Sequence, residues 1–101
     1  MLEQTAIQFD TRREALRRVA TTIQETQAEI LRFAFDRGPF GITADETAEH
    51  FDCDHNHTSP RISELLKREL LRHTGQTRPT RAGSSAAVLV HFEFAKEEDL
   101  G

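Results

Sequence analysis

The sequence predicts an α+β fold in which three to four helices are followed by a β-hairpin. Over the first two thirds of the chain, apolar residues recur at the spacing of amphipathic helices. Near the C-terminus, residues 88, 90, 92 and 94 form a period-two apolar row, which is typical of a strand. Between these parts lies a segment rich in glycine, proline and arginine, as in an exposed turn.

Length and composition predict one small domain inside a cell. A chain of 101 residues has material for a single hydrophobic core. Apolar residues make up 37% and charged residues 30%, which is typical of a globular protein. The longest apolar run is too short for a membrane helix, and no export signal is visible. Cys53 is the one cysteine, so no internal disulfide forms, and we expect a cytoplasmic protein.

Two helices are expected in the N-terminal third. Asp10 or Thr11 can cap a first helix that runs through Arg18, with Leu16 and Val19 facing inward. We treat residues 1–21 as an N-terminal helical extension and a possible dimerisation element, preceding a domain over 22–94.

The second helix is expected over residues 23–37. One face carries its apolar residues, which are Ile23, Ile30, Leu31, Ala34 and Phe35. Gly38 and Pro39 end the helix. The pair Thr21-Thr22 either separates the two helices or weakens one long helix, because β-branched residues disfavour helix only mildly.

A second pair of helices is predicted in the middle of the chain. Thr43 and Glu46 have the spacing of a capping box, which starts a short helix that ends near Phe51. Its inward residues are Ala44, Ala48 and Phe51. After a polar turn over 52–55, a longer helix is expected over 56–70, and it buries Ile62, Leu65, Leu66 and Leu70. Proline is tolerated in the first turn of a helix, so Pro60 predicts a start near residues 56–58.

Two antiparallel strands should follow, over residues 70–74 and 86–94. The loop between them contains Gly75, Pro79 and Gly83 together with Arg78 and Arg81. Residues 95–101 are acidic and predict a flexible tail.

Charge is distributed unevenly along the chain. Residues 1–54 hold six Lys and Arg against eleven Asp and Glu, residues 55–85 hold six against two, and residues 86–101 hold one against four. A basic segment inside an acidic protein indicates a surface for a polyanion, since a phosphate responds to the local field and not to the net charge.

Two helices joined by a polar turn and followed by a basic hairpin are the parts of a winged helix-turn-helix domain, whose second helix enters the major groove of double-stranded DNA. The candidate DNA-binding residues are Asn56, His57, Thr58, Ser59, Arg61, Glu64, Lys67 and Arg68 on that helix, and Arg78, Arg81 and Ser84 in the loop. Arg61 is the candidate for a bidentate contact with guanine, while Lys67 and Arg68 suit phosphates. Glu64 either accepts from cytosine or pairs with Lys67 or Arg68 along the helix.

Three runs carry a resemblance to a known family, namely Phe40–Glu46, Thr58–Leu65 and Thr74–Gly83. They resemble small winged-helix proteins of phages and prophages and, more broadly, MarR-like regulators. The resemblance implies a DNA-binding fold with a recognition helix over 58–70 and a wing centred on 78–85. Two positions depart from the family pattern. Glu69 stands where such chains have a helix-ending glycine, and Ser84-Ser85 stands where their wing has further basic residues. We therefore expect weaker binding of DNA by the wing.

The sequence also contains residue types that occur in metal sites and in cysteine-dependent catalysis. Asp52, Cys53, Asp54, His55 and His57 are potential metal ligands, but their spacing is poor for zinc. A cysteine nucleophile with His50 or His55 as its base lacks an orienting third group. We expect no enzyme activity, no metal, no cofactor and no small-molecule ligand.

The sequence therefore predicts a double-stranded DNA-binding homodimer that regulates transcription or replication, of phage or prokaryotic type. The alternative is a winged helix that has become a protein-protein interaction module, an adaptor or an inhibitor of a host protein, for which the acidic flanks are suited.

Overall fold

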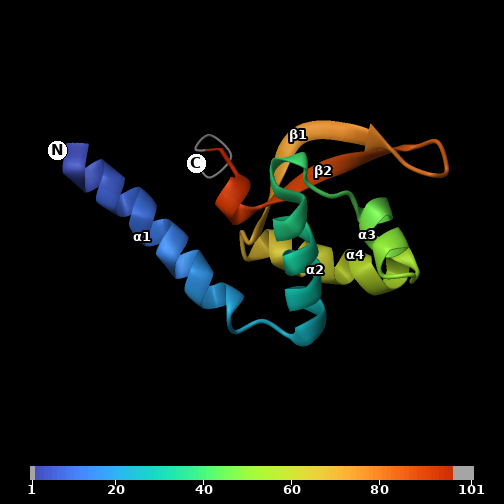
Figure 1. Cartoon of the computed structure of the whole chain (residues 1–101), viewed down its shortest axis with the longest axis horizontal. Helices are drawn as coiled ribbons and strands as arrows, with labels where there is room; N and C mark the ends of the chain where they lie inside the picture. The colour runs from blue at the N-terminus through green and yellow to red at the C-terminus, as the bar shows by residue number, and fades with distance from the viewer. Residues whose placement is uncertain (1, 97–101) are drawn as a thin grey trace.

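The computed structural model describes residues 2–96, with side chains from residue 11 onward. Its fold is α+β, and four helices precede a two-stranded antiparallel hairpin. The elements are α1 (Leu2–Ala20), α2 (Glu25–Arg37), η1 (Gly38–Phe40), α3 (Ala44–His50), α4 (His55–Lys67), β1 (Leu71–Pro79), β2 (Ser85–His91) and η2 (Phe92–Phe94). The order of elements is the predicted one (Figure 1).

The two threonines at 21 and 22 separate α1 from α2. Their hydroxyl groups donate to the carbonyls of Arg18 and Val19 at 2.7 and 2.8 Å, which satisfies the last turn of α1. The chain then re-enters a helix at Gln24, whose backbone N–H donates to the side chain of Gln27 at 3.2 Å. The helix α1 is longer than the predicted 10–18, and the side chain of the predicted cap Asp10 lies outside the described residues.

The C-terminal half of α1 is attached to the rest of the molecule by arginines. Arg12 donates to both carboxylate oxygens of Glu69 at 3.0 Å, and Arg17 Nε donates to Glu93 at 2.6 Å. Leu16 is 6% exposed and joins the core as predicted. The rest of α1 extends away from the other elements (Figure 1).

The helix α2 packs on two sides, which corrects its predicted inward face. Ile30, Leu31 and Ala34 are buried as expected, but Phe35 is 45% exposed. Phe33 is buried instead, because its ring stacks on His50 at 4.0 Å and meets the edge of Phe51 at 5.9 Å. The face of α2 that contacts α3 therefore also carries an apolar residue, Phe33.

Both α3 and α4 end with a non-glycine residue in the left-handed region. Asp52 has φ 51° and Glu69 has φ 64°. After α4, Leu70 N donates to Leu65 O at 2.9 Å and Glu69 N to Leu66 O at 3.0 Å, which is the Schellman pattern. Glu69 occupies the position where glycine is usual. Its carboxylate binds Arg12 and lies 3.1 Å from Arg72. These ion pairs connect α1 and β1 to the end of α4.

The start of α3 follows the prediction, and the bounds of α4 do not. The capping box is confirmed, since Glu46 N donates to Thr43 Oγ1 at 3.1 Å and Thr43 N to Glu46 Oε1 at 3.3 Å. The helix α4 begins at His55, so Pro60 lies in its second turn and not in the first. Its last residue is Lys67, and Leu70 follows the helix as a buried connector to β1.

Much of the predicted basic loop is strand. The strand β1 runs to Pro79 and pairs with β2 from Leu71↔His91 to Pro79↔Ser85, with an irregularity between His73 and Thr77 around Gly75. Only residues 80–84 form the turn, which we call the hairpin tip. Residues 92–94, predicted as strand, form the 3-10 helix η2, and of the predicted flexible tail Ala95 is buried while 97–101 lie outside the described residues.

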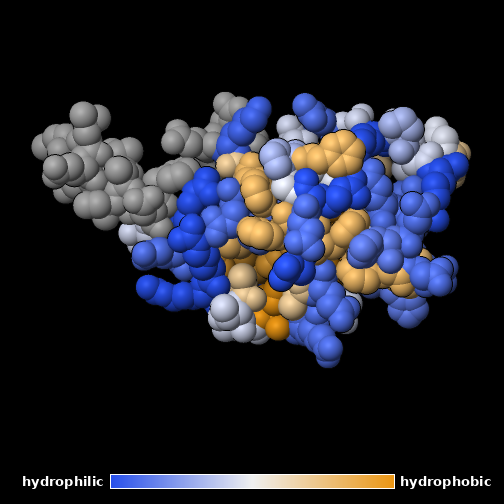
Figure 2. Space-filling model, in the orientation of Figure 1, coloured by the Kyte–Doolittle hydropathy of each residue, from blue (hydrophilic) through white to orange (hydrophobic). Residues whose placement is uncertain are grey.

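The hairpin is joined to the start of α3 by one bridge. Ile42 and Leu89 exchange two backbone hydrogen bonds of 2.8 Å. Beneath the hairpin, the core gathers apolar side chains from all four helices and both strands: Leu16, Ile30, Leu31, Ile42, Ala48, Ile62, Leu65, Leu71 and Leu89 are all buried. Figure 2 shows apolar surface between α1 and α2, flanked by polar residues. No helix in the described range 2–96 is long and apolar enough to cross a membrane.

Candidate functional site

The outer side of α4 is an exposed row of side chains. Its members are Asn56, Pro60, Ser63 and Lys67, which we call the α4 stripe. At 3.6 residues per turn these positions fall within about 60° of one another around the helix axis. The opposite side is buried through Thr58, Ile62 and Leu65. The stripe therefore faces solvent along the whole helix.

The predicted DNA-binding residues of this helix divide into three groups. Asn56, His57, Lys67 and Arg68 are exposed; Ser59, Arg61 and Glu64 are half-buried; Thr58 is buried. Thr58 is 3% exposed, and its hydroxyl has no hydrogen-bond partner in the described part of the chain. Thr58 is thus part of the interior and cannot reach a ligand on the surface, contrary to the prediction.

Arg61 and Glu64 face α2 instead of open solvent. Arg61 Nη2 donates to Glu64 Oε2 at 3.1 Å, and Arg61 Nε lies 2.9 Å from the other carboxylate oxygen. That oxygen also accepts a hydrogen bond of 2.7 Å from Gln27, a residue that is 3% exposed. Glu64 therefore pairs with Arg61, not with Lys67 or Arg68, and Arg61 is committed to a contact within the protein.

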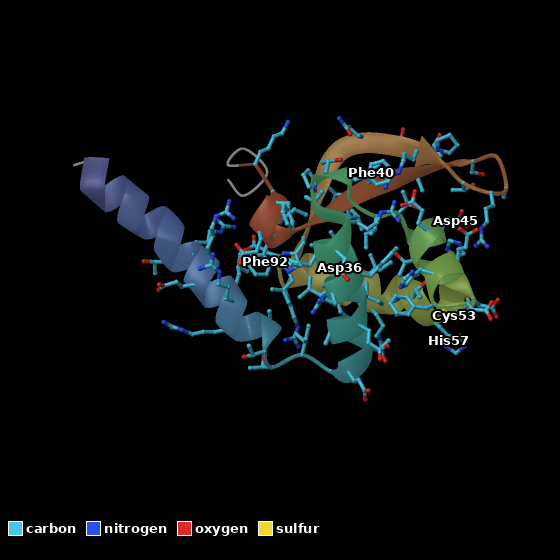
Figure 3. All side chains as sticks on the ribbon, viewed as in Figure 1. Asp36, Phe40, Asp45, Cys53, His57 and Phe92 are labelled. Atoms are coloured by element: carbon cyan, nitrogen blue, oxygen red, sulfur yellow. The ribbon has the colours of Figure 1, made fainter. Side chains whose placement is uncertain are left out.

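Asp45 joins the hairpin tip to the starts of α3 and α4. Its carboxylate accepts from the backbone N–H of Arg81 at 3.0 Å, from Arg81 Nη2 at 3.0 Å and from Arg81 Nε at 3.1 Å. His55 Nε2 lies 3.3 Å from the same carboxylate. The hydrogen bonds from Arg81 lower the pKa of Asp45 to about 2. Figure 3 shows Asp45 on the side of α3 near the hairpin, with Cys53 and His57 lower on the same end of the molecule.

Arg78 lies in β1 and is held by an inner cluster. Its guanidinium donates to both carboxylate oxygens of Glu46 at 2.9 Å and to the carbonyls of Phe40 and Gly41 at 2.7 and 3.0 Å, with its centre 3.9 Å from the Phe40 ring centroid. Burial alone would raise the pKa of Glu46, but hydrogen bonds from Arg78 bring it below its usual value. Arg78, predicted as a loop residue for DNA, is thus a strand residue with a structural role.

Among the described residues, the exposed cations outside the ion pairs are Arg18 on α1, Lys67 on α4 and Arg68 directly after α4. Arg81 is paired with Asp45 and lies 3.6 Å from Glu49, yet 55% of its side chain stays exposed. Ser84 is exposed as well. None of the six exposed α4 residues 55, 56, 57, 60, 63 and 67 is acidic.

Sequence reasoning missed Pro60 and Ser63 as surface residues of interest. Their spacing from Asn56, at i+4 and i+7, is the signal that places all three on one helix face. The potential metal ligands near Cys53 are not brought together: the described residues contain no group of three or more His, Cys, Asp or Glu side chains placed to hold an ion.

No protein-family model, no curated protein and no solved structure matches this chain.

Proposed function

We propose that the chain is a winged helix-turn-helix protein that binds double-stranded DNA by placing the α4 stripe in the major groove. The observation that carries the proposal is the stripe itself, an exposed helix face free of carboxylates beside a hairpin tip. An α-helix fits the width of the major groove, and α3 and α4 supply the two-helix arrangement that presents it.

Each exposed group has a place in such a complex. The stripe runs about 16 Å along the helix axis, from Asn56 to Lys67. Lys67 and Arg68 suit phosphates at one end, while the exposed part of Arg81 at the hairpin tip suits a phosphate at the other, with its bonds to Asp45 kept. A second copy paired through α1 presents two such faces to two half-sites, as a regulator of transcription or replication requires.

The salt dependence of DNA binding tests the proposal. Fluorescence anisotropy of a labelled duplex, followed between low and moderate salt, should show a log–log slope of about −0.9 for each phosphate engaged. The variant Lys67→Gln should weaken binding to every duplex and reduce the slope by about one phosphate. Arg32→Gln is the control, because Arg32 is an exposed cation of α2 paired with Asp36 and its loss changes the net charge equally.

A second candidate function, the protein-protein interaction module, is favoured by one observation. Phe35, Phe40 and Phe94 are large apolar residues that are 45%, 59% and 36% exposed. Exposed apolar surface of this kind occurs at protein interfaces. An affinity for DNA that is absent or unchanged by salt would favour this candidate over the first.

A further inference from the structure

Pro60 stands at an unfavourable place in α4. It is the sixth of the 13 residues of the helix and lies beyond the first turn. Proline has no backbone N–H, so the carbonyl of Asn56, four residues earlier, loses its helical donor. Replacing Pro60 by almost any other residue would restore the hydrogen bond to the Asn56 carbonyl. A residue that destabilises its own helix indicates a role other than folding.

Packing does not explain the proline. Pro60 is exposed, as are its neighbours on the same face, Asn56 and Ser63. The side chain of Asn56 makes no hydrogen bond with any residue that the structure describes. One turn of helix therefore presents a free amide and an apolar ring to solvent, about 6 Å apart along the axis.

These two groups match the major-groove edge of one kind of base pair. An asparagine amide can donate to N7 and accept from the N6 amino group of adenine, while the C5 methyl group of thymine is the one apolar group on a base edge. A G·C pair offers no methyl group, and neither guanine nor cytosine carries both an acceptor and a donor on its major-groove edge. The rise of about 3.4 Å per base pair places both groups within reach of one pair or two adjacent pairs.

We propose that Asn56 and Pro60 together select an A·T step, with Asn56 bound to adenine and the Pro60 ring packed on the thymine methyl group. This inference rests on the proposed DNA binding and names what that same face selects. It replaces the expectation of a guanine contact by Arg61, whose guanidinium is bound to Glu64.

The test begins with selection of bound duplexes from random DNA by the full chain. The preferred site should contain an A·T step at a fixed position. Replacing that thymine by deoxyuracil removes only the methyl group, and wild-type affinity should fall about fourfold, the value of one buried methyl group. Asn56→Ala should reduce the preference for adenine about tenfold.

The decisive comparison uses Pro60→Ala. This variant should distinguish the thymine and uracil duplexes by less than about twofold, because alanine keeps only the Cβ of the proline ring, whereas the control Ser63→Ala should keep the fourfold difference. Alanine restores the missing N–H, so Pro60→Ala should unfold at a higher temperature, and loss of discrimination cannot come from loss of structure. Melting curves followed by circular dichroism check this point.

The outcomes separate this inference from the proposed function. If the wild-type chain binds no duplex, the proposed function is wrong. If it selects a site that lacks a fixed A·T step, or if Pro60→Ala still distinguishes thymine from uracil by about twofold or more, DNA binding stands and the selection by Asn56 and Pro60 is overturned.

Discussion

Arg81 and Asp45 are joined by three hydrogen bonds of 3.0–3.1 Å, one from the backbone N–H of Arg81 and two from its guanidinium. The contact fixes the hairpin tip against the start of α3. His55, 3.3 Å from the same carboxylate, adds the first residue of α4. The relative positions of the elements that form the proposed DNA surface thus depend on one carboxylate.

This contact predicts an acid-dependent loss of stability. The pKa of Asp45 is lowered from 3.8 to about 2, chiefly by the Arg81 side chain, so the unfolded chain takes up the proton first as the pH falls. The stabilisation is complete above pH 3.8 and is lost as the pH falls through about 2. The difference in Tm between wild type and Asp45→Asn should therefore be largest near neutral pH and shrink below about pH 4. A difference that stays constant down to about pH 2 would contradict this assignment.

The two hairpin arginines should differ in their effect on folding. Arg78 is 21% exposed and binds two backbone carbonyls and Glu46, which also accepts from Arg37. Arg78→Ala removes a donor from these acceptors and should cost about 1–2 kcal/mol. Arg81 is 55% exposed, and Arg81→Ala should cost much less, because exposed ion pairs contribute little to stability. Urea denaturation of both variants measures the two costs. Equal costs would mean that the inner cluster around Arg78 is not formed.

Gly41 should be far less replaceable than Gly83, although both have a positive φ. A Cβ at Gly41 (φ 75°) would stand 2.4 Å from the carbonyl oxygen of Leu89, whereas a Cβ at Gly83 (φ 88°) meets no atom of the described residues within 4 Å. Gly83→Ala should cost about 1–2 kcal/mol from backbone strain alone. Gly41→Ala should cost about 3 kcal/mol or more, because the bridge between Ile42 and Leu89 must also open. Thermal unfolding of the pair of variants checks the difference.

His91 should remain neutral well below the usual range of histidine. Its ring is buried against Phe92 at 4.3 Å, and burial lowers its pKa from 6.5 to about 4 despite the nearby Glu93. Because the unfolded chain binds the proton more readily, the stabilisation is complete above pH 6.5 and is lost as the pH falls towards 4, amounting to about 3 kcal/mol. NMR titration of the imidazole should give a midpoint near 4. A midpoint at or above 6.5 would show that the ring is accessible in the folded state.

The sequence was informative wherever one local interaction decides the structure. The capping box of Thr43 and Glu46 and the helix face of Ile30, Leu31 and Ala34 depend on residues close in the chain, and the structure confirms them. The strand β2 forms near its predicted place, but the predicted alternation is wrong, since residues 88–91 are all buried. Arg78 could not be assigned in this way. Its place in a strand depends on Glu46, which is 32 residues away.

The outward face of α4 shows why tertiary contacts override a helical wheel. The periodicity places Leu70 on the apolar face, but Leu70 lies beyond the helix. It predicts an exposed Thr58, but Thr58 is buried. Exchanging Leu70 for Thr58 in the buried set turns the predicted outward face by about 30° at 100° per residue. The error favoured Arg61 and Glu64 over Pro60 and Ser63. A polar residue buried beneath a neighbouring helix leaves no signal in periodicity.

The proposed contact between the α4 stripe and DNA is tested most directly by a negative charge placed at the centre of the stripe. Ser63 is exposed in the middle of the stripe, so Ser63→Glu places a carboxylate against the bases and phosphates of a bound duplex. Binding measured by anisotropy should fall at least about tenfold for every duplex, while Thr26→Glu, the same charge at an exposed position of α2, should have little effect. If Ser63→Glu binds DNA as tightly as the wild-type chain, the α4 stripe is not the DNA-binding surface.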